Sequence, residues 1–372
     1  MSASPNVSPQ QVTVTSLGAW PGTDPVEAAK VSLGLLTSPH LPCLAELPAR
    51  GVGSDAVGRT ASLLLELPVD VQPYGWRFVD RSGHDHRRAV SALSTDVNVL
   101  ADVAGAGDIT PAELKVQVMG PVSLAAAIHL HYGERALRDH GARRDIAQSL
   151  AAGLAVHAQK VQAAVPGSAL ILQIDEPSAA PALAGTIPTA SGYRTLRSIP
   201  ASELRTTWST LVAAAREAGF AQIAINLAPA ESLGASASVT GGPGSDDVKS
   251  AEARAWRKAL ETALESGVDA VALPLNELDT GHWEMLASAI ESGLGVWAGT
   301  VPGRSGAVPP SYSILAERIM RPWRGLGLGE TLLNQLRITP ETSLAGVSPQ
   351  EARTVLNRAL EVAERLSEIR YL

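Results

Sequence analysis

ALILQIDEPS, residues 169–178, is an apolar run that ends in two adjacent carboxylates and a proline. Leucine and isoleucine alternate through the run with one polar residue, Gln173, which is the pattern of a short interior strand. Pro177 lacks the N–H group that a sheet ladder requires, so we expect the strand to end before it. Asp175 and Glu176 are therefore predicted to lie at the C-terminal end of a buried strand.

Seven more strand-like runs occur along the chain, and segments with helical periodicity lie between them. The runs are VTVTSLG (12–18), VDVQPYG (69–75), LKVQVMG (114–120), QIAINLA (222–228), DAVALPL (269–275), LGVWAGT (294–300) and NQLRITP (334–340). The helical segments are 143–164, 201–219, 251–267, 282–293, 312–326 and 349–366. Gly219 and Gly267 each precede a strand, where a glycine can end a helix in the left-handed conformation. Eight strands that alternate with helices predict an α/β fold, a single (β/α)8 TIM barrel, and the alternative is an open doubly wound sheet.

The predicted domain organisation is simple. Residues 1–11 are expected to be a flexible N-terminal tail, and residues 12–372 to form one barrel domain. Two long stretches rich in small residues, 176–200 and 233–250, follow predicted strands. They predict extended loops at the C-terminal face, which is where barrel enzymes assemble their active sites.

Composition narrows the class of protein. The 372 residues carry a formal charge of −7, 45% of them are hydrophobic, and only 4% are aromatic. This mild acidity argues against a nucleic-acid partner or an anionic membrane. Cys43 is the only cysteine, which excludes an internal disulfide and predicts a cytoplasmic protein. The N-terminus has neither the basic segment nor the apolar core of a signal peptide.

Five motifs in order resemble the catalytic barrel of the cobalamin-independent methionine synthase family. They are SLGAWPGTDPVEA (16–28), YGWR (74–77), MGPVSLA (119–125), LQIDEP (172–177) and RITPETSLAGVSPQEAR (337–353). The chain length resembles the short, single-barrel relatives, within the uroporphyrinogen decarboxylase/methionine synthase-like superfamily. The resemblance implies a methyltransferase of methionine biosynthesis, which transfers a methyl group from a 5-methyltetrahydrofolate-type donor to the thiol of homocysteine. It also implies zinc and the methyl-folate as cofactor and donor.

The family activates the thiol with zinc, because a metal-bound thiol is deprotonated and held as a nucleophile. The resemblance places the family's ligands at Asn226 and Ala228, in the region of residues 273–274, and at Thr342. Asn and Thr offer only weak neutral oxygens and Ala offers none, so we expect the zinc site to be degenerate and no metal to be bound. Glu277, three residues beyond the expected glutamate, would be a lone ligand.

The resemblance also implies a substrate site. Asp175 matches the carboxylate that holds the homocysteine ammonium, and Leu17 and Gly18 match the backbone positions that meet its carboxylate. Glu176, Tyr74 and Trp76 lie in the matching motifs and are predicted to contribute. The second ammonium-binding acid is expected near Val52, where no carboxylate aligns.

Two other functions stay open. One is a catalytically altered, non-zinc relative that binds an amino acid, folate or a partner protein without methyl transfer. The other is a decarboxylase of the uroporphyrinogen type, which would use arginines after the first strand. The stretch GAWPGTDP (18–25) contains no arginine, so this alternative has the least support.

Overall fold

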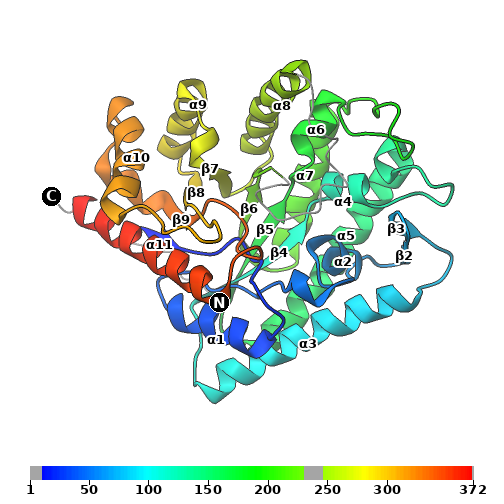
Figure 1. The fold of residues 1–372 in the computed structure, drawn as a ribbon, viewed down its shortest axis with the longest axis horizontal. Helices are drawn as coiled ribbons and strands as arrows, with labels where there is room; N and C mark the ends of the chain where they lie inside the picture. The colour runs from blue at the N-terminus through cyan, green and yellow to red at the C-terminus, as the bar shows by residue number, and fades with distance from the viewer. Residues whose placement is uncertain (1–10, 230–245, 371–372) are drawn as a thin grey trace.

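The computed structural model describes residues 11–229 and 246–370, and its centre is a curled sheet of seven parallel strands (Figure 1). In spatial order the strands are β1 (Thr13–Val14), β9 (Leu336–Pro340), β8 (Gly295–Val301), β7 (Ala270–Pro274), β6 (Phe220–Asn226), β5 (Ala169–Asp175) and β4 (Glu113–Met119). All seven were predicted as strands, and each neighbour pair is parallel. The sheet is therefore TIM-barrel-like.

Helices surround this sheet and connect successive strands (Figure 1). The longer ones are α1 (Pro25–Leu35), α3 (His84–Ala106), α5 (His140–Ala164), α7 (Ala201–Glu217), α8 (Asp246–Leu264), α9 (Thr280–Glu291), α10 (Tyr312–Gly325) and α11 (Pro349–Arg370). Short helices are α2 (Ala56–Ala61), α4 (Pro121–Ala127), α6 (Ala179–Ala184), and the 3-10 turns η1 (Pro48–Arg50), η2 (Ala136–Arg138), η3 (Leu275–Glu277) and η4 (Glu330–Gln335). The six predicted helices are confirmed. Gly219 and Gly267 have φ angles of 97° and 84°, as expected for left-handed helix ends.

The predicted second strand was wrong. Residues 69–75 do not join the sheet: β2 (Val69–Gln72) pairs antiparallel with β3 (Gly75–Phe78) in a separate hairpin outside the sheet (Figure 1). The space between β1 and β4 is instead crossed by residues 41–46, which we call the bridging segment. It makes isolated parallel bridges from Leu41 to Thr15 and from Cys43 to Lys115.

The bridging segment is too irregular to count as a strand. Its backbone bonds both neighbours, with Leu41 N donating to Val14 O at 2.9 Å and Leu44 N to Lys115 O at 2.9 Å. Pro42 has no N–H to add to this ladder. The regular strands consequently form a curled sheet that is not a closed barrel, although the chain follows the order of a barrel throughout.

The interior of the curled sheet holds polar as well as apolar side chains. Trp297 lies at its centre, 1% exposed, with small neighbours such as Ala224 and Ala272. Two cations lie against its ring: Lys115 Nζ at 5.9 Å and the Arg337 guanidinium at 5.5 Å from the centroid. Lys115 is fully buried. A buried lysine requires nearby acceptors or negative charge, and these lie toward the C-terminal end of the strands.

Two predictions about termini and loops lie mostly outside the described residues. Residues 1–10 of the predicted tail are not described, and neither is most of the predicted loop 233–250. In the described ranges, no helix combines the length and apolar character needed to cross a bilayer.

Helix α5 packs so closely on the segment after α2 that one position tolerates only glycine. A Cβ atom on Gly153 would lie 1.9 Å from the carbonyl oxygen of Leu63. We expect Gly153→Ala to lower the free energy of unfolding by about 1–3 kcal/mol, because the helix or the segment must move. Gly34, exposed in α1 with no atom within 4 Å of an added Cβ, is the control. Gly34→Ala should raise stability by about 0.5–1 kcal/mol. Urea denaturation measures both, and equal effects would contradict the close packing.

Candidate active site

The C-terminal ends of neighbouring strands bring polar side chains together. In the sheet register Asp175, the last residue of β5, is paired with Met119 of β4 and with Asn226 of β6. The three positions therefore lie side by side at one end of the sheet, where strand order and pleat direct their side chains inward. Asp175 is 5% exposed and Asn226 is 1% exposed.

One oxygen of Asp175 is held by two amide groups. Its Oδ1 accepts hydrogen bonds from Gln173 Nε2 at 2.8 Å and from Asn226 Nδ2 at 2.7 Å. Gln173 Nε2 also donates to the backbone oxygen of Leu17 at 2.9 Å. Oδ2 has no hydrogen-bond partner in the part of the chain that the structure describes. The carboxylate is thus fixed in orientation through one oxygen, and the other remains available.

A second carboxylate, Glu46, lies close to Asp175 and was missed in the sequence. It ends the bridging segment, is 5% exposed, and its backbone N–H donates to Gly18 O at 3.0 Å. Its Oε1 lies 3.9 Å from Arg59 Nε. The resemblance placed a second ammonium-binding acid near Val52, and the segment that carries Glu46 was not among the predicted strands. The available signal was the apolar run LPCLAELP (41–48), in which Glu46 stands two residues before Pro48, as Asp175 stands two residues before Pro177.

Burial raises the pKa of both acids, and the charge of Glu46 adds to the shift at Asp175. Burial, and then the charge of Glu46, raise the pKa of Asp175 to about 7, against the hydrogen bonds from Gln173 and Asn226 and the charge of Lys115. Burial also raises the pKa of Glu46, although Arg59 opposes the shift. The pKa of Lys115 is lowered by burial. A nearby cation from solution would relieve the repulsion between the two acids.

Glu176 has a different environment from its neighbour Asp175. Its Oε1 accepts from Val122 N at 3.1 Å and Trp208 Nε1 at 2.9 Å, and its Oε2 from Ser123 N at 2.8 Å and Ser123 Oγ at 2.7 Å. The absence of a side chain at Gly120 leaves space for the Glu176 carboxylate, because a Cβ atom on Gly120 would lie 2.3 Å from it. The side chain, 1% exposed, ties the start of α4 to α7. Its predicted contact with substrate has no support in this geometry.

The other predicted substrate residues divide into two groups. Leu17 and Gly18 lie beside the acids: the Leu17 oxygen is bonded by Gln173, and Gly18, with φ of 115°, packs against the Gln117 side chain. Tyr74 and Trp76 lie on the β2–β3 hairpin instead. Tyr74 stacks edge-on against His129 at 5.1 Å, and Trp76 is buried. The structure gives neither hairpin residue a contact with Asp175.

The positions matched to zinc ligands do not form a metal site in the described residues. Both ends of the Asn226 amide already make hydrogen bonds. Its Nδ2 donates to Asp175, and its Oδ1 accepts from Ala228 N at 3.0 Å. Thr342 Oγ1 donates to Gly303 O at 3.4 Å. Within residues 11–229 and 246–370, no three His, Cys, Asp or Glu side chains are grouped so that they could hold a metal. Glu277 lies near another acid, Glu341. Burial raises the pKa of Glu341, and the charge of Glu277 adds to this shift.

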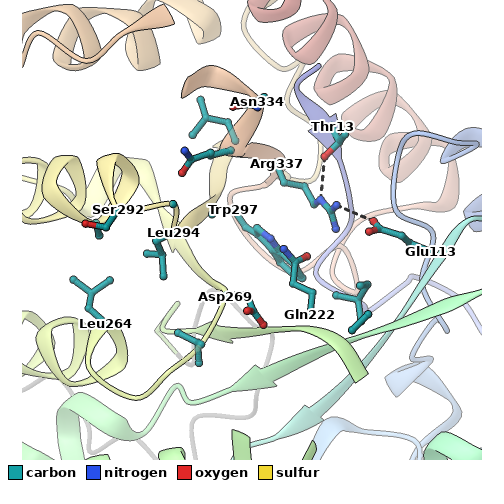
Figure 2. A pocket seen from close by; sticks show the side chains of 18 of the residues that line it. Thr13, Glu113, Gln222, Leu264, Asp269, Ser292, Leu294, Trp297, Asn334 and Arg337 are labelled. Atoms are coloured by element: carbon teal, nitrogen blue, oxygen red, sulfur yellow. Dashed lines mark hydrogen bonds and ion pairs between the residues drawn. The ribbon is translucent and has the colours of Figure 1, made fainter. Parts of the chain in front are cut away.

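A large cavity lies at the opposite end of the sheet (Figure 2). It has a volume of about 810 Å³ and is lined by the starts of the strands, including Glu113 and Arg337. Its buried cation is already paired: Arg337 donates from Nε to Thr13 Oγ1 and from Nη2 to Glu113 Oε2, each at 3.0 Å. In barrels this end serves stability, so we place the candidate site at the other end of the sheet, at Asp175 and Glu46.

Comparisons with known proteins support the fold. No family model matches the chain, and no curated protein matches its sequence. A B12-independent methionine synthase from Shewanella sp. W3-18-1, solved in complex with selenomethionine, is 12% identical, with a TM-score of 0.58 over 97% of this chain and 100% of the other. The chain shares the fold of that protein.

Two further solved structures align over similar lengths. A putative vitamin-B12 independent methionine synthase from Listeria monocytogenes is 16% identical over 96% of this chain and 98% of its own, with a TM-score of 0.49. A GH113 β-1,4-mannanase is 10% identical, with a TM-score of 0.38 over 97% of this chain and 99% of its own. At 12% identity the likeness to the Shewanella protein concerns the fold alone, and a barrel fold hosts many activities.

Proposed function

We propose that the protein binds an α-amino acid of the methionine or homocysteine type, with the ligand's ammonium group held between Asp175 and Glu46. The observation that carries the proposal is the pair of nearly buried carboxylates at the C-terminal ends of the bridging segment and of β5, which lie on either side of β4. One oxygen of Asp175 has no partner in the described chain, and the pKa of each acid is raised. An ammonium ion supplies the charge and the three N–H donors that such a pair lacks.

Two features support an amino acid over a simple cation. The bonded Leu17 carbonyl fixes the loop before Gly18 beside the acids, where backbone groups can meet a carboxylate. The Shewanella protein that shares this fold was solved with selenomethionine, an amino acid of the proposed class. The resemblance of the sequence motifs to the methionine synthase family points to the same ligand.

The residues present do not fit zinc. Thiol activation of the family's kind requires nitrogen, sulfur or carboxylate ligands around the metal. At the matched positions this chain has the committed amide of Asn226, the methyl group of Ala228 and the hydroxyl of Thr342. We therefore propose amino-acid binding without the zinc-dependent methyl transfer, and treat methyl transfer from a methyl-folate as the competing function.

Calorimetry with L-methionine and L-homocysteine tests the proposal. The matched control is 4-(methylthio)butyrate, which has the same carboxylate and thioether but no ammonium group. We expect heat of binding for the amino acids and none for the control. Equal binding of both would contradict the role of the acids. Formation of methionine from homocysteine and 5-methyltetrahydrofolate, with zinc bound near one equivalent, would establish the competing function.

The proposed contact predicts a pH dependence. Asp175 must be ionised to bind an ammonium, and its pKa is about 7. Between about pH 6 and about pH 8, affinity for methionine should rise about tenfold, since the ligand must displace a proton at the lower pH. The methionine ammonium keeps its charge over this range. Titrations across the range measure the slope, and an affinity that stays constant or falls with pH would exclude Asp175 as the contact.

A further inference from the structure

We propose that Lys115 is a positioning residue, which sets the orientation of the Asp175 carboxylate and of the loop at Leu17 through the side chain of Gln173. In the sheet register Lys115 is paired with Ile171, four residues before Asp175, so it lies deeper in the interior of the sheet than Asp175 and acts without touching a ligand. The inference rests on the proposed function for its consequence on binding, but its structural part concerns only residues of this chain.

The chain of contacts is continuous. Lys115 Nζ donates to Gln173 Oε1 at 2.6 Å, a short, charge-assisted hydrogen bond. An amide whose oxygen is held by an ammonium must turn its NH2 group the other way. Gln173 Nε2 then donates to both Asp175 Oδ1, at 2.8 Å, and Leu17 O, at 2.9 Å. Lys115 and these two acceptors together fix which end of the Gln173 amide faces the site.

This choice has a direct chemical effect at Asp175. If the amide of Gln173 turned over, its oxygen would face the carboxylate oxygen and the Leu17 carbonyl, so three acceptors would meet without a donor. Gln173 is fully buried, and no water-filled side is available to relieve such contacts. The Lys115 ammonium, which would then face the NH2 group of Gln173, opposes this arrangement as well. Asp175 Oδ1 and the Leu17 carbonyl both receive their hydrogen bonds only while the Gln173 amide keeps its orientation.

The charge of Lys115 adds a second effect. The groups that face Lys115 are Asp175 and Glu46, together with Cys43 and, from below, Arg337. The groups that face Asp175 are Glu46, Lys115, and the neutral amides of Gln173 and Asn226. Lys115 is the cation among the groups that face Asp175, and in its absence the repulsion from Glu46 would be opposed by the amides alone.

Lys115→Met removes the charge and keeps a side chain of similar length. We expect the titration of Asp175 to move upward by about one pH unit or more. Methionine affinity should then fall about tenfold at about pH 7 and largely recover by about pH 8.5. An affinity like that of the unmodified protein at neutral pH, or an equal loss at every pH, would overturn the inference. The second of these outcomes would indicate general structural damage.

Gln173→Met separates orientation from charge. It keeps the Lys115 cation but removes the amide, so we expect affinity to stay at least about tenfold low even at about pH 8.5, where Lys115→Met recovers. It also provides a test if Lys115→Met does not fold. Recovery of Gln173→Met at high pH would contradict an orienting role for the amide.

A measurement without ligand keeps this inference distinct from the proposed function. The pH dependence of the thermal midpoint, compared between Asp175 and Asp175→Asn proteins, reports the titration of Asp175 itself. The Asp175 and Asp175→Asn proteins are compared once with Lys115 present and once with the Lys115→Met substitution in both. A shift of the difference curve to higher pH supports the role of Lys115 even if no amino acid binds. Superimposable curves would overturn it even if methionine does bind.

Discussion

Asp175→Asn should lose at least about a hundredfold in affinity for methionine, the largest functional effect that we expect from a single substitution. The reason is charge: asparagine keeps the size and the oxygen that Gln173 and Asn226 bind, but it presents an NH2 group to the incoming ammonium. Calorimetry near pH 8 measures the loss. Asp145→Asn, on the exposed face of α5, is the control and should bind as the unmodified protein does. Unchanged affinity in Asp175→Asn would reject the proposed ammonium site.

The same substitution should stabilise the protein at high pH. The pKa of Asp175 is raised from 3.8 to about 7 in the folded state, so the folded protein holds a proton that the unfolded chain releases between these values. Stability therefore falls as pH rises through this window, by up to about 4 kcal/mol for a shift of about three units. Asparagine has no proton to lose. Thermal midpoints of the two proteins should coincide near about pH 4 and diverge in favour of Asn by about pH 8.

This opposition between stability and binding is itself diagnostic. A carboxylate retained for packing would destabilise the fold when replaced, whereas one retained for a ligand is held at a cost to the fold. Loss of stability at about pH 8 in Asp175→Asn would thus contradict the assigned role even if binding were also lost.

The sequence was sufficient for most of the fold. The seven strands of the sheet were predicted because each is a short, mainly apolar run, and because the helices before two of them end in glycine, at Gly219 and Gly267. Asp175 was placed correctly at the end of β5, since Pro177 limits the strand. These predictions depend only on residues that are close together in the sequence, so they do not require knowledge of tertiary contacts.

The second barrel position could not be predicted by the same means. VDVQPYG (69–75) has better strand propensity than residues 41–46, and it does form a strand, β2, but with β3 as its partner. The bridging segment contains Pro42 and has no β-branched residue, so propensity predicts a loop. Its position depends on backbone bonds to Val14 and Lys115, which are distant in the sequence.

The two adjacent acids could not be told apart in the sequence for a similar reason. The donors that hold Glu176 come from residues 122–123, before it, and from Trp208, well after it. Asp175 meets an amide one strand further along, at Asn226. Alternation of side chains along a strand indicates that neighbours face opposite ways, but the partners on each side are fixed only by the fold.

Glu176→Gln should give the largest loss of stability, about 3 kcal/mol or more, with little change in the ligand contacts themselves. Each carboxylate oxygen accepts two hydrogen bonds, from Val122 N and Trp208 Nε1 on one side and from Ser123 N and Oγ on the other. In either orientation, the amide NH2 of glutamine faces two donors. The Ser123 hydroxyl cannot easily turn to accept, because Ser178 N already donates to its oxygen at 3.0 Å.

Urea denaturation of Glu176→Gln measures this loss, and Glu265→Gln supplies the control. Glu265 pairs with Arg205 at 3.1 Å on the exposed surface, with side chains more than half exposed, so its replacement should change stability by less than about 1 kcal/mol. A Glu176→Gln protein as stable as the control would mean that the carboxylate is not a structural tie. In that case the predicted contact of Glu176 with substrate would regain support, and the two acids would share one role. Opposite effects of Asp175→Asn and Glu176→Gln on stability would instead separate them, because one carboxylate strains the fold for a ligand and the other holds α4 and α7 together.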